Sequence, residues 1–90
     1  MTQDIDVDIY DLKEFICALQ SFQDAIEDQF KAVEYDWDSC DQSWQGESKE
    51  RFTDDFERMR DRTKRTLEAG EDALQWLKKY DQILEDFERF

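Results

Sequence analysis

The chain has 90 residues, of which 41% are charged, contains no proline and carries a formal net charge of −13. This length allows one domain, and the strong negative charge argues against nucleic acids and anionic membrane surfaces as partners. Hydrophobic residues make up 39% of the chain and recur with a regular period, which argues against disorder and is typical of long surface helices or coiled coils.

The first predicted element is a helix over about residues 5–43. Its apolar positions alternate steps of four and three residues, which is the period of a seam between two helices, whereas a strand needs a period of two. One member of this seam, Gln23, is polar. The predicted seam comprises Ile5, Ile9, Leu12, Ile16, Leu19, Gln23, Ile26, Phe30, Val33, Trp37, Cys40 and Trp44.

A turn is predicted at residues 44–47, in the middle of the chain. Gly46 is one of only two glycines, and it can adopt the left-handed conformation that ends a helix. Ser43 or Ser48 supplies a cap, and two glutamates fall in the first turn of the next helix, where the helix dipole favours acidic side chains. We therefore expect an all-α fold, an antiparallel two-helix hairpin with a Trp-x-Gly turn.

The second predicted element is a helix over about residues 48–88, with the same alternation of steps. Gly70 lies in its interior, where glycine costs about 1 kcal/mol relative to alanine. In the hairpin we expect Gly70 opposite Leu19–Phe22, with Phe22 filling the space that the glycine leaves; a kink at Gly70 is the competing explanation. The predicted seam comprises Phe52, Phe56, Met59, Thr63, Thr66, Gly70, Ala73, Leu77, Tyr80, Leu84 and Phe87.

A second set of apolar residues flanks the two seams near the open end of the hairpin, where the termini meet. Two helices bury one seam against each other, so these flanking residues require another partner. The natural product is a four-helix bundle, and a self-partner and a different protein fit the residues equally well. The predicted partner interface comprises Phe15, Phe22, Leu67, Leu74, Trp76, Ile83 and Phe90.

The sequence offers little for catalysis or for metal binding. It contains no histidine, no glycine-rich phosphate loop and no nucleophile elbow, so we expect no catalytic residues and no enzyme activity. Cys17 and Cys40 lie 23 positions apart on one predicted helix, which is beyond disulfide reach, and we expect free, buried or half-buried thiols. Two distant cysteines do not make a zinc site, and we expect neither a metal nor a cofactor.

The turn carries the one distinctive motif. Trp44-Gln45-Gly46 stands at the midpoint between two amphipathic helices, with Phe52 six residues after the glycine. This resembles the Trp-x-Gly (WXG, early-secreted-antigen-like) family of small type VII secretion proteins, with Trp44, Gly46 and Phe52 as the turn motif. The resemblance implies a homodimer, or a heterodimer with another WXG-like hairpin or with the helical N-terminal domain of an effector toxin. It also implies synthesis in the cytoplasm and export, without a cleaved signal peptide, by a machine that a membrane-bound ATPase drives.

Two further features bear on export. Met1–Asp11 is acidic where a signal peptide has a basic region, and no transmembrane run is present. Many members of the resembled family carry an export signal, Tyr-x-x-x-Asp/Glu, after the second helix. Here Tyr80 is followed by Leu84 at the fourth place, and Glu85 comes one place late. Tyr80 and Leu84 also fall on the predicted seam, so we favour a role in the core and export as the companion of a larger effector.

The leading hypothesis is a non-enzymatic type VII secretion protein, either a small exported substrate or the co-secreted targeting partner of an effector toxin. A cytosolic coiled-coil adaptor or structural protein is the main alternative, in which case the turn motif is a coincidence. An antitoxin that masks a basic target with its acidic first arm is a third hypothesis.

Overall fold

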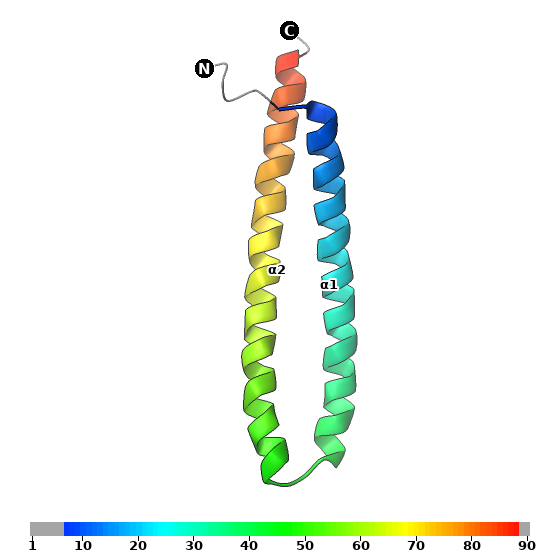
Figure 1. Cartoon of the computed structure of the whole chain (residues 1–90), viewed down its shortest axis with the longest axis vertical. Helices are drawn as coiled ribbons and strands as arrows, with labels where there is room; N and C mark the ends of the chain where they lie inside the picture. Colours follow the sequence, from blue (N-terminus) through cyan, green and yellow to red (C-terminus); the bar gives the residue numbers. More distant parts are fainter. Residues whose placement is uncertain (1–6, 89–90) are drawn as a thin grey trace.

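The computed structural model describes residues 7–88, and these form two long α-helices that lie side by side and antiparallel (Figure 1). Helix α1 spans Ile9–Ser43 and helix α2 spans Glu47–Glu88. The molecule measures 66 × 21 × 15 Å, with a radius of gyration of 19.8 Å, against about 12 Å for a globular domain of this length. The expected all-α hairpin is confirmed, and so thin a rod has one seam rather than an enclosed core.

Helix α1 begins at Ile9, later than the expected start near residue 5. Asp8 is its N-cap: one carboxylate oxygen accepts hydrogen bonds from the backbone N–H groups of Tyr10, at 2.8 Å, and Asp11, at 3.3 Å. Capping of this kind satisfies N–H groups that have no partner within the helix. Because the cap residue itself is extended, with φ −71° and ψ 117°, the helix cannot continue through it. Ile5 of the expected seam lies outside the described residues.

The turn differs in detail from the expected one. Trp44 ends α1 in an extended conformation, and its N–H donates to the carbonyl of Cys40 at 2.9 Å. Gly46 has a φ of +114°, and its carbonyl accepts from the N–H of Glu50 at 3.3 Å. The glycine therefore opens α2 rather than closing α1. A side chain at Gly46 would meet nothing within 4 Å, so the positive φ alone requires glycine there.

The seam on α2 is shifted from the expected one at every second position. Phe56, Thr63, Gly70, Leu77 and Leu84 face α1 as expected. Between them lie half-buried or buried residues one place later than expected, and the expected Met59, Thr66, Ala73 and Phe87 are exposed. The observed seam buries Leu67 and Leu74, whereas the expected one would have buried Thr66 and Ala73. Burying the larger apolar side chains stabilises the hairpin more. The residues that complete the observed seam are Arg60, Leu67, Leu74 and Asp81.

Gly70 is explained by Gln23 and not by Phe22. A Cβ atom at Gly70 would lie 2.1 Å from Oε1 of Gln23, and Nε2 of Gln23 donates to the carbonyl of Leu67 at 3.0 Å. Gln23 is 8% exposed, whereas Phe22 is 57% exposed. The expectation that Phe22 fills this space is wrong, because Phe22 lies on a different side of α1 from the seam. A polar member of a seam fixes the alignment of two helices, since misalignment leaves its amide unpaired.

Candidate partner-binding face

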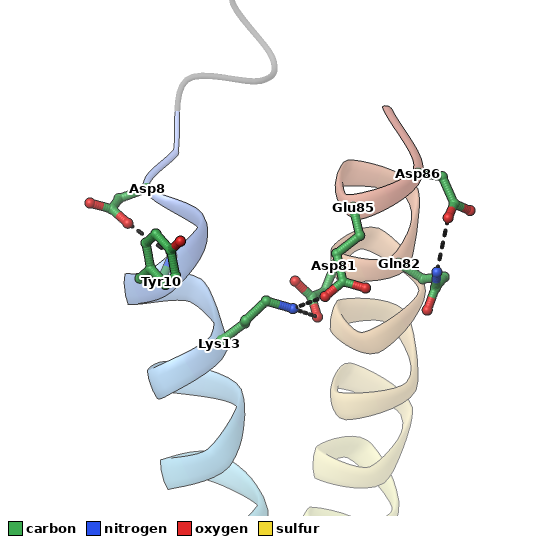
Figure 2. Close-up of polar contacts among 7 residues, drawn as sticks. All are labelled: Asp8, Tyr10, Lys13, Asp81, Gln82, Glu85 and Asp86. Atoms are coloured by element: carbon green, nitrogen blue, oxygen red, sulfur yellow. Dashed lines mark hydrogen bonds and ion pairs between the residues drawn. The ribbon is translucent and has the colours of Figure 1, made fainter. Parts of the chain in front are cut away.

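One side of the helix pair is joined by polar contacts, which we call the bridged face. Nζ of Lys13 donates to Asp81 at 2.9 Å and also to Glu85 (Figure 2). Nζ of Lys78 donates to Oε1 of Gln20 at 2.8 Å. The hydrogen bonds with Glu85 and Asp81 raise the pKa of Lys13. These contacts connect the two helices along the open half of the hairpin.

Several exposed aromatic residues lie on the opposite side. Residues two apart on an α-helix point about 200° away from each other, so Phe15 points away from the side on which Lys13 bridges. The same relation holds at every bridging residue, because each has an exposed apolar residue two places away. The pairs are Lys13 with Phe15, Gln20 with Phe22, Lys78 with Trp76, Asp81 with Ile83, and Glu85 with Phe87.

These aromatic residues belong to a stripe whose members are all uncharged, and we call it the apolar face. Its members recur in steps of three and four along both helices, as a second seam does. In a chain with 41% charged residues, so long an uncharged stripe makes this face the candidate binding surface. The members are Phe15, Ala18, Phe22, Ala25, Gln29 and Ala32 on α1, and Thr66, Ala69, Ala73, Trp76, Tyr80, Ile83 and Phe87 on α2.

At the open end of the hairpin the apolar face carries large side chains, which are exposed but contact one another along α2. Trp76 and Ile83 are 63% and 62% exposed. The rings of Trp76 and Tyr80 stack at 5.3 Å with an angle of 15° between them. Trp76, Lys79, Tyr80 and Ile83 line a shallow hollow of about 220 Å³. The alanines of the face leave room for the side chains of another helix to approach closely.

The structure corrects part of the expected interface. Phe15, Phe22, Trp76 and Ile83 are exposed on the apolar face, and their role in binding stays a prediction. Leu74 is fully buried, with an exposed fraction of 0%, in a cluster with Leu12, Ile16 and Leu84. It is therefore a core residue, and placing it in the interface was wrong, because the seam of α2 passes through it. Leu67 is half-buried on the same seam, and Phe90 lies outside the described residues.

The interpretation of the sequence missed Phe87 and the alanines of the face. The sequence predicts Phe87 in the seam, yet its side chain is 67% exposed. Positions 69, 73, 76, 80, 83 and 87 are separated by alternating steps of four and three, so the sequence does indicate a second stripe on α2. The sequence does not indicate which of the two neighbouring stripes packs on α1.

The turn motif belongs to an aromatic cluster that closes the other end of the hairpin. The ring of Trp44 lies 5.8 Å from that of Phe52, and Trp37 stacks on Phe56 at 4.8 Å. The guanidinium of Arg60 lies 5.1 Å from the centre of the Phe56 ring. Aromatic pairs of this geometry contribute about 0.5–1.5 kcal/mol beyond the area they bury. Trp44 and Phe52 therefore have a structural role in joining the helices, independent of any role in recognition.

Both residues of the degenerate export signal take part in the packing of the open end. Tyr80 is half-buried and packs against the cluster of Leu12, Ile16, Leu74 and Leu84. Glu85 is bonded to Lys13 across the hairpin. An export role for Tyr80 and Glu85 stays a prediction.

The described residues offer few other sites. Cys17 and Cys40 are free, as expected, but both are exposed; the expectation of buried thiols was wrong, because the seam passes beside them. Within residues 7–88 there is no group of three or more His, Cys, Asp or Glu residues that could hold a metal ion. Neither described helix is long and apolar enough to cross a membrane.

Comparison with known proteins gives one match. The model of the WXG100 family, described as proteins of 100 residues with WXG, matches residues 4–89. No curated protein and no solved structure matches the chain.

Proposed function

Because this chain belongs to the WXG100 family, whose members are small helical proteins that type VII systems secrete, we propose that it is exported by such a system as half of a helical complex. The protein is non-enzymatic in this proposal and acts by binding. The apolar face is the observation that carries it. A surface free of charge in so charged a chain has a physical reason only when it is covered.

The energetics of the face support a second pair of helices as its cover. Phe15, Phe22, Trp76 and Ile83 each remain more than half exposed, and complete burial of one such side chain is worth about 1.5–3 kcal/mol. The spacing of the face suits helices that pack lengthwise, so the expected product is a four-helix bundle. The polar contacts of the bridged face keep the hairpin aligned while the other face binds.

The partner supplies the other half of the exported complex. It is another hairpin of the same kind or the helical N-terminal domain of an effector toxin, in which case this chain is the co-secreted targeting partner. The secretion ATPase then acts on the assembled complex. A bundle formed before export also covers the apolar face in the cytoplasm, where exposed aromatic residues favour aggregation.

Export is tested by comparing culture supernatant with cell lysate for a tagged chain, in cells with and without the secretion ATPase. We expect the protein in the supernatant only when the ATPase is present. A cytosolic enzyme, followed in the same samples, controls for lysis. Retention in the lysate in both strains would favour the cytosolic adaptor and would contradict the proposed function.

A further inference from the structure

Polar contacts between the two helices recur every seven residues along α1, with one interruption. The contacts join Lys13 to Asp81 and Glu85, Gln20 to Lys78, Glu34 to Arg60, and Asp41 to Lys49. Glu27, the middle member of this row, pairs with Lys31 of its own helix at 3.5 Å and with no residue of α2 among those that the structure describes. Glu27 is exposed, whereas the other four members are half-buried. The row therefore joins the helices at both ends of the hairpin but not in its middle.

An acid stands opposite Glu27, at the place where the other levels have a partner. Glu27 lies seven residues after Gln20 on α1, and Glu71 lies seven residues before Lys78 on α2. Gln20 and Lys78 are in contact, the helices run antiparallel, and both rise by the same amount per residue. Glu71 therefore faces Glu27, and two carboxylates meet at the one level of the row that has no contact.

Two more acids face the same gap. Asp24 and Glu68 line a hollow of about 320 Å³ together with the two facing acids. The bases nearby in the sequence are Lys31 and Lys64, and neither makes an ion pair across the hairpin within the described residues. Carboxylates gathered in this way repel one another. We call this level the waist, and it comprises Gln23, Asp24, Glu27, Leu67, Glu68, Gly70 and Glu71.

The seam is polar at the waist. Its contact there is the side chain of Gln23, which lies over Gly70 and donates to the carbonyl of Leu67 at 3.0 Å. The apolar cluster around Leu74 lies on the open side of the waist. Phe30 and the aromatic cluster lie on the side of the turn. The waist therefore divides the apolar packing of the hairpin into two parts.

We propose that the open half of the hairpin unfolds locally while the turn half stays joined, and that the charges of the waist control this opening. The open half comprises residues 9–20 and 74–88, and the turn half comprises residues 28–64. The short turn keeps the segments of the turn half close together, whereas the segments of the open half are joined only through a much longer loop. Once separated, they are helices of about 12–15 residues, a length that is marginal in water.

This opening also bears on the apolar face. Phe15 lies on the α1 segment of the open half, and Trp76 and Ile83 lie on its α2 segment. Separation of the two segments divides the face between them, so the face is continuous only while the waist is closed. The opening itself does not depend on export, and its test is independent of the test of the proposed function.

A charge change in the waist and a matched one beside it test the proposal. Glu71→Lys places a base opposite Glu27. Asp72→Lys is the control, because Asp72 lies two residues from both Gly70 and Leu74 of the seam and so points away from α1. Both acids are exposed, and each variant changes the net charge from −13 to −11. Hydrogen exchange of the full chain is followed by mass spectrometry, for each half separately, at several urea concentrations below the unfolding transition.

In the unaltered chain we expect amides of the open half to exchange at least about tenfold faster than those of the turn half, as local unfolding requires. Their exchange should also depend less on urea, because local opening exposes less surface. Glu71→Lys should slow exchange of the open half about fivefold, since repulsion across the waist is replaced by surface ion pairs. Asp72→Lys should change it by less than about twofold. Circular dichroism checks that each variant keeps its helicity.

Equal exchange and equal urea dependence in the two halves would overturn the proposal, since the hairpin would then open as one unit. Faster exchange in the turn half would overturn it too. Equal slowing by Glu71→Lys and Asp72→Lys would show that net charge alone sets the stability, and the waist would lose its role. Loss of export with the expected exchange pattern intact would contradict only the proposed function.

Discussion

The two long faces of the hairpin both carry large side chains, but these side chains bridge the two helices on one face and remain exposed on the other. On the bridged face, long polar side chains reach across the seam, and Lys13 joins two carboxylates of α2. On the apolar face, aromatic side chains alternate with alanines and remain more than half exposed. The difference shows that the two helices bury one seam between them and leave a second apolar stripe exposed. A pair of helices cannot bury both stripes by itself.

The largest expected effect is a difference in unfolding free energy between a core residue and an apolar-face residue of α2. Leu74→Ala should lower the free energy of unfolding by about 2–5 kcal/mol, because Leu74 is fully buried. Ile83→Ala removes a similar side chain that is 62% exposed, and it should change the stability of the isolated hairpin by less than about 0.5 kcal/mol. Urea unfolding at a concentration below dimer formation, followed by circular dichroism, measures both. Equal losses would mean that the two residues do not differ in burial.

A smaller effect on stability is expected at Gly70 in the seam, and its sign should depend on whether Gln23 is present. Gly70→Ala should destabilise the hairpin by about 1 kcal/mol, because the new Cβ displaces Gln23 and leaves its amide unpaired. With Gln23→Ala already in place, the same change should stabilise by about 1 kcal/mol, since alanine is the better helix former. The two unfolding free energies are compared in a double-mutant cycle. A stabilising Gly70→Ala in the original chain would contradict the role of Gln23.

The smallest effect concerns the bridged face and depends on pH. The bonds with Glu85 and Asp81 raise the pKa of Lys13 in the folded state. Its contribution to stability is therefore complete below the ordinary lysine pKa of about 10.4 and is lost as the pH rises through the higher folded value. Lys13→Met should lower the melting temperature at pH 8, and the gap to the unaltered chain should narrow near pH 11. A gap that stays constant would show that the ammonium charge contributes nothing.

The sequence was enough to predict the hairpin, its turn and the seam of α1 as far as Phe30, because steps of four and three residues leave little choice for a helix. It was not enough to choose the stripe of α2 that packs on α1. Tyr80 and Phe87 on one stripe compete with Leu67 and Leu74 on the next, and both stripes have the right period. Only the alignment with α1 decides between them.

The exposure of the candidate interface residues was predicted in part for the same reason. Aromatic residues that did not fit the seam, such as Phe22 and Trp76, were correctly placed on the exposed surface. The sequence wrongly predicts Leu74 in the interface, because the expected seam passes through its neighbour Ala73. In the structure Leu74 is buried and Ala73 is exposed. The sequence also indicates a space at Gly70. It does not indicate that Gln23 fills this space, because the two residues are far apart along the chain.

The central claim is that the apolar face, and not the charged surface beside it, binds the partner. Its most direct test compares Trp76→Asp with Ile83→Asp in one chain against Gln75→Asp with Gln82→Asp in another. Both chains add two negative charges to α2, and the control residues are the exposed neighbours just before the face residues. We expect the face variant to keep its helicity but to elute as a monomer after purification from its native host, whereas the control elutes as a complex. Complexes of equal size for the two chains would contradict the claim.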